Sequence, residues 1–368
     1  MKIALLGTRG IPASYGGFET FAEQLSVRLA GRGHEVTVYC RRNQVADCGP
    51  LYRGVRIALL PTIAHKYLDT IAHTFFSTIH LLGRNCDLAL FCNGANALFT
   101  VLPRLRGVPT VLNVDGLERQ RTKWNALARA WYLLSERLAT WFPNAVVADA
   151  AVIQNYYSER YGKATHLIAY GADTGKVETT AVLDRLGLRP EEYFLYVSRL
   201  EPENNALMVV RAFERSSVDK KLLVVGDAPY AEDYVGQVKA TSDPRILFPG
   251  AIYGRGYHEL QSHSFAYIHA TEVGGTHPAL IEAMGRGRPV LYLDTPENRE
   301  VAAEAGVAYP KDEAELTKAI EALAKSPQAE RLRMGEAARS IVHQRYDWER
   351  VVDQYEALFR ELAGQASG

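Results

Sequence analysis

The amino-acid sequence predicts an α/β protein of two domains, each built on a parallel sheet with helices on both faces. Short β-branched runs alternate with longer amphipathic runs along the whole chain, and this alternation is typical of parallel strands joined by helices. Each half of the chain also has its own glycine turn after its first strand-like run. The length of 368 residues is enough for about two domains.

The strand-like runs begin at the N-terminus. KIALLG, residues 2–7, precedes the helical run FETFAEQLSVRLAGRG, residues 18–33, and HEVTVYC, residues 34–40, follows that helix. The next strands expected in the first half are DLALFC (87–92), TVLNVDG (110–116) and AVVADA (145–150). Those expected in the second half are YFLYVSRL (193–200), KLLVVGD (221–227), RILFPG (245–250), FAYIHA (265–270) and PVLYLD (289–294).

The domain boundary is expected in LIAYGADTGKVETTAVLDRLGL, residues 167–188, where strand-like residues give way to Gly, Asp and Thr. We therefore assign residues 1–170 to the first domain and residues 171–345 to the second. The C-terminal run, residues 346–364, has apolar side chains at helical spacing. They are Trp348, Val351, Val352, Tyr355, Leu358 and Phe359. The final residues, AGQASG, are expected to form a loose tail.

Composition and charge narrow the class of protein. With 47% hydrophobic and 23% charged residues the composition is ordinary for a globular protein, and no apolar run reaches the roughly 18 residues of a spanning helix. The opening run MKIALLGTRGIP is interpreted as a strand because it has no small-residue cleavage site of a signal peptide. The cysteines show no metal-ligand spacing, which predicts reduced thiols in a cytoplasmic protein. They are Cys40, Cys48, Cys86 and Cys92.

The net charge of zero is divided unevenly along the chain. Residues 1–180 contain 20 Lys and Arg against 13 Asp and Glu, whereas residues 181–368 contain 22 against 29. The basic half can face phosphates or an anionic membrane, or the two halves can simply attract one another. A peripheral position on the inner face of the membrane is therefore the alternative to a free cytoplasmic protein.

The first glycine turn, GTRGIPASYGGFET at residues 7–20, follows a strand and opens a helix. Dinucleotide-binding folds place phosphates at such a turn, but this turn lacks the G-x-G-x-x-G spacing and contains Pro12. A nicotinamide site is therefore not expected. Gly16 and Gly17 leave backbone room for another ligand, and the alternative is a flexible loop.

In the second half, the run YVSRLEPENN ends a strand with Arg199. A cation at the carboxyl end of a parallel strand lies in the crevice where doubly wound sheets bind ligands. Guanidinium is also suited to bidentate contact with phosphate. The alternative is a surface ion pair with Glu201 or Glu203.

The stretch EVGGTHPALIEAMGRGRPV, residues 272–290, places Gly274, Gly275 and Thr276 where a strand ends and a helix begins. A helix N-terminus offers N–H donors and a positive dipole end to an anion. Glu282, further along the helix, can accept hydrogen bonds from sugar hydroxyls. Backbone donors for phosphates and a carboxylate for a ribose indicate a nucleotide diphosphate site, whereas the alternative is a turn with solvated acids.

Four motifs together resemble the retaining GT-B glycosyltransferases of family 4, over essentially the full chain. They are the Gly16-Gly17 loop, YGAD at 170–173, SRLEPENN at 198–205 and EVGGTHPALIEAM at 272–284. The runs GTRGIPASYGGFETFAEQLS and VDGLERQRTKW further resemble a rhamnosyltransferase-type subgroup of bacterial polysaccharide enzymes. The resemblance implies two Rossmann-like doubly wound domains that face one another across a cleft, with a C-terminal helix that crosses back to the first domain.

The resemblance also implies roles for individual residues. Arg199 would bind the donor diphosphate, and the backbone of residues 274–276 would cradle the phosphates and the sugar. Glu282 would hold the ribose hydroxyls, and Glu272 would lie near the transferred sugar.

Three departures from the family pattern bear on the donor sugar. Asn204 stands where the family usually has a Lys five residues after the Arg. We expect Asn204 to contact the donor from that position. The family's E-x7-E pair is E-x9-E here, from Glu272 to Glu282. Asp115 stands where many members have a His facing the donor sugar, and it is the candidate for positioning the donor sugar or the acceptor hydroxyl.

The expected reaction transfers a sugar from a dTDP- or UDP-linked donor to a polysaccharide or lipid-linked saccharide, with dTDP-rhamnose as the first candidate donor. No D-x-D occurs in the chain, so we expect neither a metal nor any other cofactor. No acid pair suited to a double displacement is evident. In the family's front-face mechanism the leaving phosphate helps deprotonate the acceptor, and Arg199 and a helix N-terminus would stabilise its charge.

Two rival functions and one question about the partner stay open. The rivals are a sugar-nucleotide epimerase of the same fold and a non-enzymatic two-domain sugar-binding protein; no nucleic-acid partner is expected. The run RQRTKWNALARAWYLLSERLATWFP, residues 119–143, mixes cations with aromatic residues. It is either an interfacial helix that docks on a membrane or a core helix with a solvated basic edge.

Overall fold

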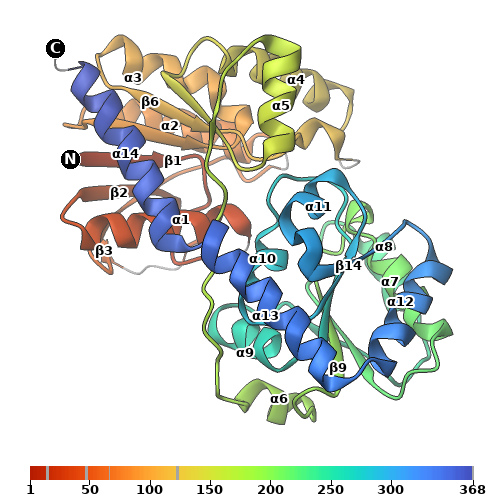
Figure 1. Ribbon diagram of the computed structural model, residues 1–368. Coiled ribbons are helices and arrows are strands. Elements are labelled where there is room, and N and C mark those ends of the chain that lie inside the picture. The colour runs from red at the N-terminus through yellow and green to blue at the C-terminus, as the bar shows by residue number, and fades with distance from the viewer. Residues whose placement is uncertain (14–15, 46–48, 66, 122–123, 367–368) are drawn as a thin grey trace. The chain divides into compact units, whose positions relative to one another are not determined.

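The computed structural model describes all residues except 14–15, 46–48, 66, 122–123 and 367–368. The chain divides into two compact units (Figure 1). Unit 1 consists of Met1–Tyr170 and Trp348–Gly368, and unit 2 consists of Gly171–Asp347. Each unit has one sheet with parallel strands and helices around it, which confirms the predicted fold class.

The sheet of unit 1 has eight strands in the order β3-β4-β2-β1-β5-β6-β7-β8. Their bounds are β1 Lys2–Leu6, β2 Glu35–Arg41, β3 Leu51–Tyr52, β4 Val55–Leu60, β5 Leu88–Cys92, β6 Thr110–Asn113, β7 Ala145–Ala148 and β8 His166–Leu167. All neighbours pair in parallel except β3 and β4. All five residues of β5 are buried, as expected of a parallel strand covered on both faces.

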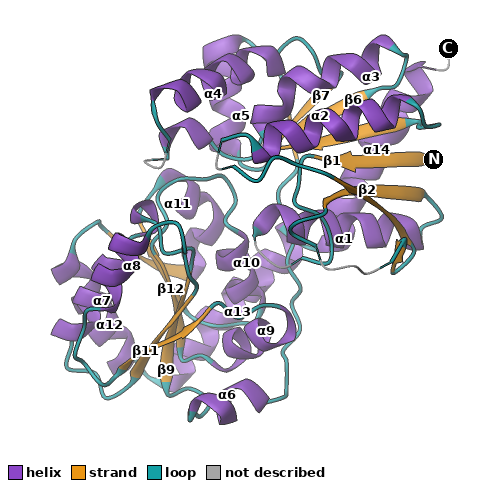
Figure 2. Cartoon of the chain, turned by 180° about the vertical axis from the view of Figure 1, so that it is seen from behind, coloured by secondary structure: helices purple, strands orange, loops and turns teal. Residues whose placement is uncertain are grey.

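Helices connect these strands. They are α1 Gly17–Gly31, α2 Asp69–Leu82, η1 Gly94–Thr100, α3 Val101–Leu105, η2 Glu118–Gln120, α4 Ala126–Ala139, α5 Ala151–Tyr161 and α14 Trp348–Ala366. Helix α14 lies in front of the strands of unit 1 in Figure 1, and α2 lies in front of them when the molecule is seen from behind in Figure 2. The sheet is therefore covered on both faces.

Helix α14 packs on α1 through the apolar stripe expected from the sequence. All six side chains of that stripe are buried, from Trp348 to Phe359. The helix continues to Ala366, so the loose tail predicted from residue 363 is wrong for residues 363–366. Leu362 is also buried, and its packing extends the helix by another turn.

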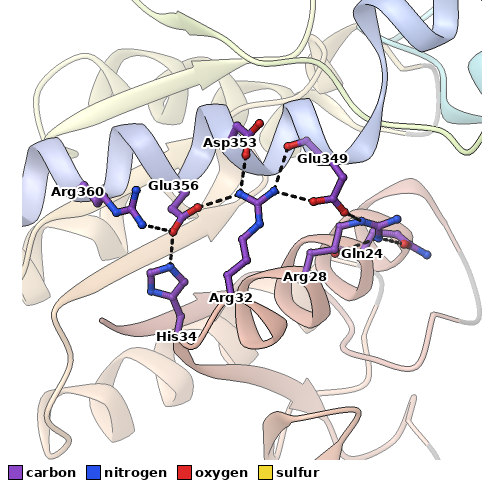
Figure 3. Close-up of polar contacts among 8 residues, drawn as sticks. All are labelled: Gln24, Arg28, Arg32, His34, Glu349, Asp353, Glu356 and Arg360. Atoms are coloured by element: carbon purple, nitrogen blue, oxygen red, sulfur yellow. Dashed lines mark hydrogen bonds and ion pairs between the residues drawn. The ribbon is translucent and has the colours of Figure 1, made fainter.

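An ionic cluster joins the polar edge of α14 to the end of α1 (Figure 3). Arg32 contacts three carboxylates of α14: Glu349 at 2.6 Å, Asp353 at 2.6 Å and Glu356 at 2.9 Å. His34 Nε2 lies 2.8 Å from Glu356 Oε1. The hydrogen bond with His34 is the main reason why the pKa of Glu356 falls below its usual value, although burial opposes the shift.

The sheet of unit 2 has six parallel strands in the order β11-β10-β9-β12-β13-β14. Their bounds are β9 Tyr193–Val197, β10 Lys221–Val225, β11 Ile246–Gly250, β12 Ala266–His269, β13 Val290–Leu293 and β14 Gly306–Tyr309. The helices are α6 Ala181–Leu186, η3 Pro202–Asn204, α7 Ala206–Arg215, α8 Glu232–Lys239, α9 Gly254–His263, α10 Pro278–Gly285, α11 Pro296–Ala302, η4 Ala303–Ala305, α12 Glu313–Lys325 and α13 Gln328–Arg345.

The strand order of unit 2 reverses between its first strand, β9, and its fourth strand, β12. Doubly wound sheets bind ligands at the carboxyl ends of the strands at such a reversal. The order of unit 1 reverses in the same way between β1 and β5. The loops after these strands are therefore the places to look for a site in each unit.

The structure adds strands β3, β4, β8 and β14 to those expected from the sequence. Strands β3 and β8 have only two residues each, too few for a periodic pattern to reveal. Among the described cysteines, Cys40, Cys86 and Cys92 form no disulfide bond, whereas Cys48 lies outside the described residues. No described helix is long and apolar enough to span a bilayer.

Candidate donor and acceptor sites

The loops after β9 and β12 of unit 2 carry most of the predicted site residues. Arg199 and Asn204 follow β9, and Glu272 with residues 274–276 follows β12. Strands β9 and β12 are neighbours in the sheet. The two loops therefore begin side by side at the reversal of the strand order.

The guanidinium group of Arg199 is about one-third exposed, and its Nη2 lies 3.6 Å from Glu201 Oε2. Glu201 is buried, and the hydroxyl of Tyr230 donates to its other oxygen at 2.8 Å. The ion pair with Glu201 that the sequence left open is therefore present. It orients the guanidinium group without covering it.

Asn204 is buried, and its side-chain amide donates to the backbone carbonyl of Arg199 at 2.6 Å. The hydroxyl of Tyr196 donates to the carbonyl of Asn204 at 2.5 Å. These contacts fix the path of the loop around Arg199. The side chain of Asn204 thus contacts the backbone of Arg199 and supports the loop.

Glu272 connects the two loops. Its Oε1 accepts a hydrogen bond from the Asn205 side chain at 2.6 Å and forms an ion pair with Lys311. Its backbone N–H donates to the carbonyl of Glu203 at 3.0 Å. The carboxylate of Glu272 is therefore already engaged within unit 2.

Residues 274–276 precede α10, and His277 is the N-cap residue of that helix. A Cβ atom on Gly274 would lie 2.5 Å from Cε1 of His277, so only glycine allows this ring to pack where it does. Thr276 and His277 are buried. The two glycines add no side chains of their own to this stretch of backbone before the helix, as an anion site favours, although the His277 ring packs against Gly274.

Glu282 is buried in α10, and the hydroxyl of Tyr257 donates to its Oε2 at 2.7 Å. The side-chain amide of Gln261 donates in turn to the Tyr257 oxygen at 2.7 Å. Burial raises the pKa of Glu282 to about 7, against the opposing effects of the Tyr257 hydrogen bond and of the charge on Arg286. This carboxyl can therefore exchange a proton near neutral pH.

In unit 1, Gly16 is the N-cap residue of α1 and Gly17 its first residue. Two carboxylates of α1 hold the loop that precedes it. Glu19 Oε1 accepts from the backbone N–H of Arg9 at 3.0 Å, and Glu23 Oε2 accepts from that of Ala13 at 2.7 Å. The described part of this loop is therefore fixed to the helix that it opens.

Asp115 lies just after β6 in a left-handed conformation with φ of 53°. Its backbone N–H donates to the side-chain oxygen of Asn113 at 3.0 Å, and its Oδ1 accepts from the Tyr170 hydroxyl at 3.4 Å. Burial and the charge of Glu118 raise the pKa of Asp115 to about 6. The Asn113 amide donates to the Tyr355 hydroxyl of α14 at 2.8 Å, so the C-terminal helix supports this strand end.

Tyr170 links the two parts of unit 1 that carry predicted site residues, namely the start of α1 and Asp115 after β6. Its ring makes edge contacts with Phe18 and Phe21 of α1, at centroid distances of 6.2 and 5.3 Å. Its hydroxyl reaches Asp115. One side chain thus links the start of α1 to the end of β6.

Sequence reasoning missed several residues that support these sites. Lys311, Tyr257, Gln261 and Tyr170 are among them. Gly226 is another, because a Cβ atom there would lie 1.8 Å from the carbonyl oxygen of Ser198, beside Arg199. The runs YGAD and VVGD contain Tyr170 and Gly226 and could have drawn attention to them. No local sequence pattern marks Lys311, Tyr257 or Gln261. Among the described residues, no three His, Cys, Asp or Glu side chains gather as a set of metal ligands.

Comparison with known proteins identifies both halves of the chain. Residues 15–176 match the family described as "Glycosyltransferase Family 4", and residues 184–341 match that described as "Glycosyl transferases group 1". A curated relative, N-acetyl-alpha-D-glucosaminyl L-malate synthase of Bacillus anthracis, is 27% identical over 177 residues. That alignment covers 47% of this chain and 46% of the relative, so it spans about half the length of each.

Solved structures match over almost the whole chain. A sucrose-phosphate synthase from Thermosynechococcus elongatus has a TM-score of 0.80 and 21% identity, with 99% of both chains covered. HepE from Anabaena, solved in complex with UDP and glucose, has a TM-score of 0.78 and 17% identity, with 98% of this chain and 100% of that chain covered. These likenesses concern the fold. The chain is a glycosyltransferase of the GT-B type, with a family 4-like first domain and a group 1 second domain.

Proposed function

We propose that the protein is a retaining glycosyltransferase that moves a sugar from a nucleotide diphosphate sugar to a polysaccharide or lipid-linked saccharide, without a metal. Unit 2 binds the donor in this proposal, and unit 1 receives the acceptor. L-rhamnose from dTDP-rhamnose is the first candidate donor, because the runs at residues 7–26 and 114–124 resemble a rhamnosyltransferase-type subgroup.

The observation that carries the proposal is the pairing of Arg199 with the glycine backbone before α10. Both lie at the carboxyl ends of adjacent strands. Guanidinium and the N–H groups at a helix start each favour phosphate oxygens. An anion that contacts both would be a diphosphate held between the two loops.

Glu282 is the reason to expect a nucleotide diphosphate in this site and not a bare diphosphate. A carboxylate would repel a bare diphosphate, but it can accept hydrogen bonds from the hydroxyls of a ribose. Tyr257 and Gln261 already hold its side chain in one orientation. HepE from Anabaena, which shares the fold, has been solved with UDP-glucose, which supports a nucleotide sugar as the donor here.

In the proposed reaction the acceptor oxygen bonds to the anomeric carbon on the face from which the diphosphate leaves. The bond from that carbon to the phosphate oxygen breaks, and the acceptor proton passes to the diphosphate. Arg199 and the N–H groups before α10 stabilise the charge on the leaving group. Asp115 positions the donor sugar or the acceptor hydroxyl, and Glu272 helps to hold the transferred sugar.

A thermal-shift screen without added metal tests the donor site. We expect one of dTDP, UDP, GDP, ADP, dTDP-rhamnose and UDP-GlcNAc to raise the Tm selectively, because a ligand at a hundred times its Kd adds about 2.7 kcal/mol. Arg199→Ala and Gly274→Ala should abolish the shift, the latter because the new Cβ displaces His277. Gly236→Ala in α8 is the matched control, since its Cβ would meet nothing within 4 Å.

Incubation of the donor without an acceptor distinguishes the proposal from its epimerase rival. An enzyme that converts the sugar of the donor with no acceptor present would be an epimerase. No shift with any nucleotide, or a shift that survives Arg199→Ala and Gly274→Ala, would remove the proposed donor site.

A further inference from the structure

Helix α4 of unit 1 presents apolar side chains to solvent. Leu127, Leu133 and Leu134 are 80%, 43% and 50% exposed, and Trp141, just after the helix, is 58% exposed. Single exposed apolar residues are common on protein surfaces, but several on one short helix indicate a contact surface. The interpretation of residues 119–143 as a core helix with a solvated basic edge therefore does not account for the apolar side chains that α4 exposes.

Helix α2 also presents apolar side chains to solvent. Phe75, Phe76 and Ile79 of that helix are 46%, 40% and 49% exposed. Element η1 packs against both α2 and α4, and its Phe99 makes a ring contact with Phe75 at 6.4 Å. Helices α2 and α4 thus both pack on η1, and we call their exposed side chains together the α2–α4 surface.

The charges on this surface are of one sign. Arg104 and Arg106 of the α3 segment and Arg129 and Arg137 of α4 are exposed. By contrast, the described residues of α2, α3 and α4 include no exposed carboxylate. The two acids of these helices are engaged elsewhere: Asp69 with Arg41 at 2.5 Å, and the buried Glu136 with Arg119 at 3.0 Å.

A pocket of about 390 Å³ opens at the C-terminal end of α4. It is lined by Arg137, Thr140, Trp141, Arg160 and Tyr161. The guanidinium group of Arg137 lies 5.6 Å from the centre of the Trp141 ring, and that of Arg160 lies 5.6 Å from the centre of the Tyr161 ring. Two guanidinium groups held on aromatic rings beside a threonine hydroxyl suit a phosphate group.

We propose that the α2–α4 surface docks unit 1 on an anionic phospholipid bilayer, with a headgroup phosphate in the pocket between Arg137 and Arg160. Arginines interleaved with leucines and a terminal tryptophan are typical of helices that lie in the membrane interface. None of the residues of this surface is assigned a part in the proposed transfer, so the inference does not depend on that reaction.

Vesicle flotation tests the proposal. The full-length protein should float with vesicles of phosphatidylcholine mixed with phosphatidylglycerol, far less with phosphatidylcholine alone, and less as salt is raised. Arg137→Gln should lower the partition coefficient about five-fold. The double variant Leu134→Ser/Arg137→Gln should lower it further, since it also removes exposed apolar surface.

The matched control is Leu332→Ser/Arg333→Gln on α13 of unit 2. Leu332 is 54% exposed, close to the 50% of Leu134, and Arg333 is also exposed. This variant should float like the parent protein. Because all four side chains are exposed, both variants should keep the parent Tm.

Three results would overturn the proposal. The parent protein does not float with anionic vesicles, or both double variants float equally well with them, or Arg137→Gln alone floats as well as the parent protein. A fourth would replace it: self-association in sedimentation experiments that Leu134→Ser abolishes would show that the surface joins two copies of the chain.

Discussion

At the scale of single residues, the candidate sites depend on carboxyl groups that the fold removes from water. Glu282 in unit 2 and Asp115 in unit 1 both have raised pKa values, with burial as the main cause. Such shifts concentrate at functional sites because an isolated carboxylate is costly to bury. A ligand that supplies hydroxyl donors would compensate for part of that cost.

The raised pKa of Glu282 predicts how stability depends on pH. The folded protein holds this proton up to about pH 7, whereas the unfolded chain releases it near its ordinary value. The stabilising contribution of the protonated carboxyl is therefore fully present at low pH and is lost as pH rises through about 7. Glu282→Gln, which mimics the protonated form, should gain about 2–3 kcal/mol relative to the parent between pH 5 and pH 8.

Urea denaturation of both proteins at the two pH values measures this difference. Glu259→Gln is a useful comparison, because the pKa of Glu259 is lowered, so Glu259 is ionised at both pH values and the difference between this variant and the parent should hardly change from pH 5 to pH 8. A difference between Glu282→Gln and the parent that stays constant with pH would mean that Glu282 is already ionised in the folded protein.

At the scale of secondary structure elements, α14 belongs to unit 1 although it follows unit 2 in the chain. Its apolar stripe packs on α1 and its polar edge forms the cluster around Arg32 and Glu356 (Figure 3). The Tyr355 hydroxyl reaches Asn113 below Asp115. The helix therefore connects the stability of unit 1 to the geometry of its candidate site.

Glu356→Gln should lower the unfolding free energy by about 1–3 kcal/mol, because it removes a buried charge that accepts from Arg32 and His34. The folded pKa of Glu356 is depressed, so its contribution is present above the ordinary glutamate pKa and is lost as pH falls through the lower folded value. Chemical denaturation at pH 7 and at pH 4 measures both effects.

Arg360→Ala provides the control within the same cluster. The Arg360 side chain is 67% exposed, whereas that of Glu356 is 8% exposed. An exposed ion pair contributes about 0.2–1 kcal/mol, so this variant should change stability little. Equal losses from Glu356→Gln and Arg360→Ala would show that the cluster acts as ordinary surface charge.

At the scale of the whole molecule, both sheets reverse their strand order, and the candidate residues lie in the loops at or beside these points. In the proposed site, Arg199 and the backbone before α10 of unit 2 would bind a diphosphate. They would supply the positive charge that a bridging metal provides in other sites. We therefore expect transfer from the nucleotide sugar to proceed at an unchanged rate after dialysis against EDTA. Loss of turnover in EDTA, with recovery on adding Mg²⁺ or Mn²⁺, would contradict metal independence.

Much of the fold could be predicted because its signals are local. Parallel strands buried on both faces are continuous apolar runs, as in β5 and β12. The apolar stripe of α14 repeats every three or four residues in the sequence itself. Glycines and a cation directly after a strand mark the two loops of unit 2, since the strand direction determines where those residues lie.

The sequence by itself determined the two-sheet α/β architecture, the course of α14 as a helix, and the loops that hold Arg199 and residues 274–276. Only the tertiary structure decided which side chains hold the carboxyl groups of the candidate sites: Tyr257 contacts Glu282, Lys311 contacts Glu272, and Tyr170 contacts Asp115. It also decided that the leucines of α4 face outward. The physical reason is that periodicity and turn chemistry act between near neighbours in the chain, whereas burial, ion pairing and pKa shifts arise between groups that packing brings together from distant positions.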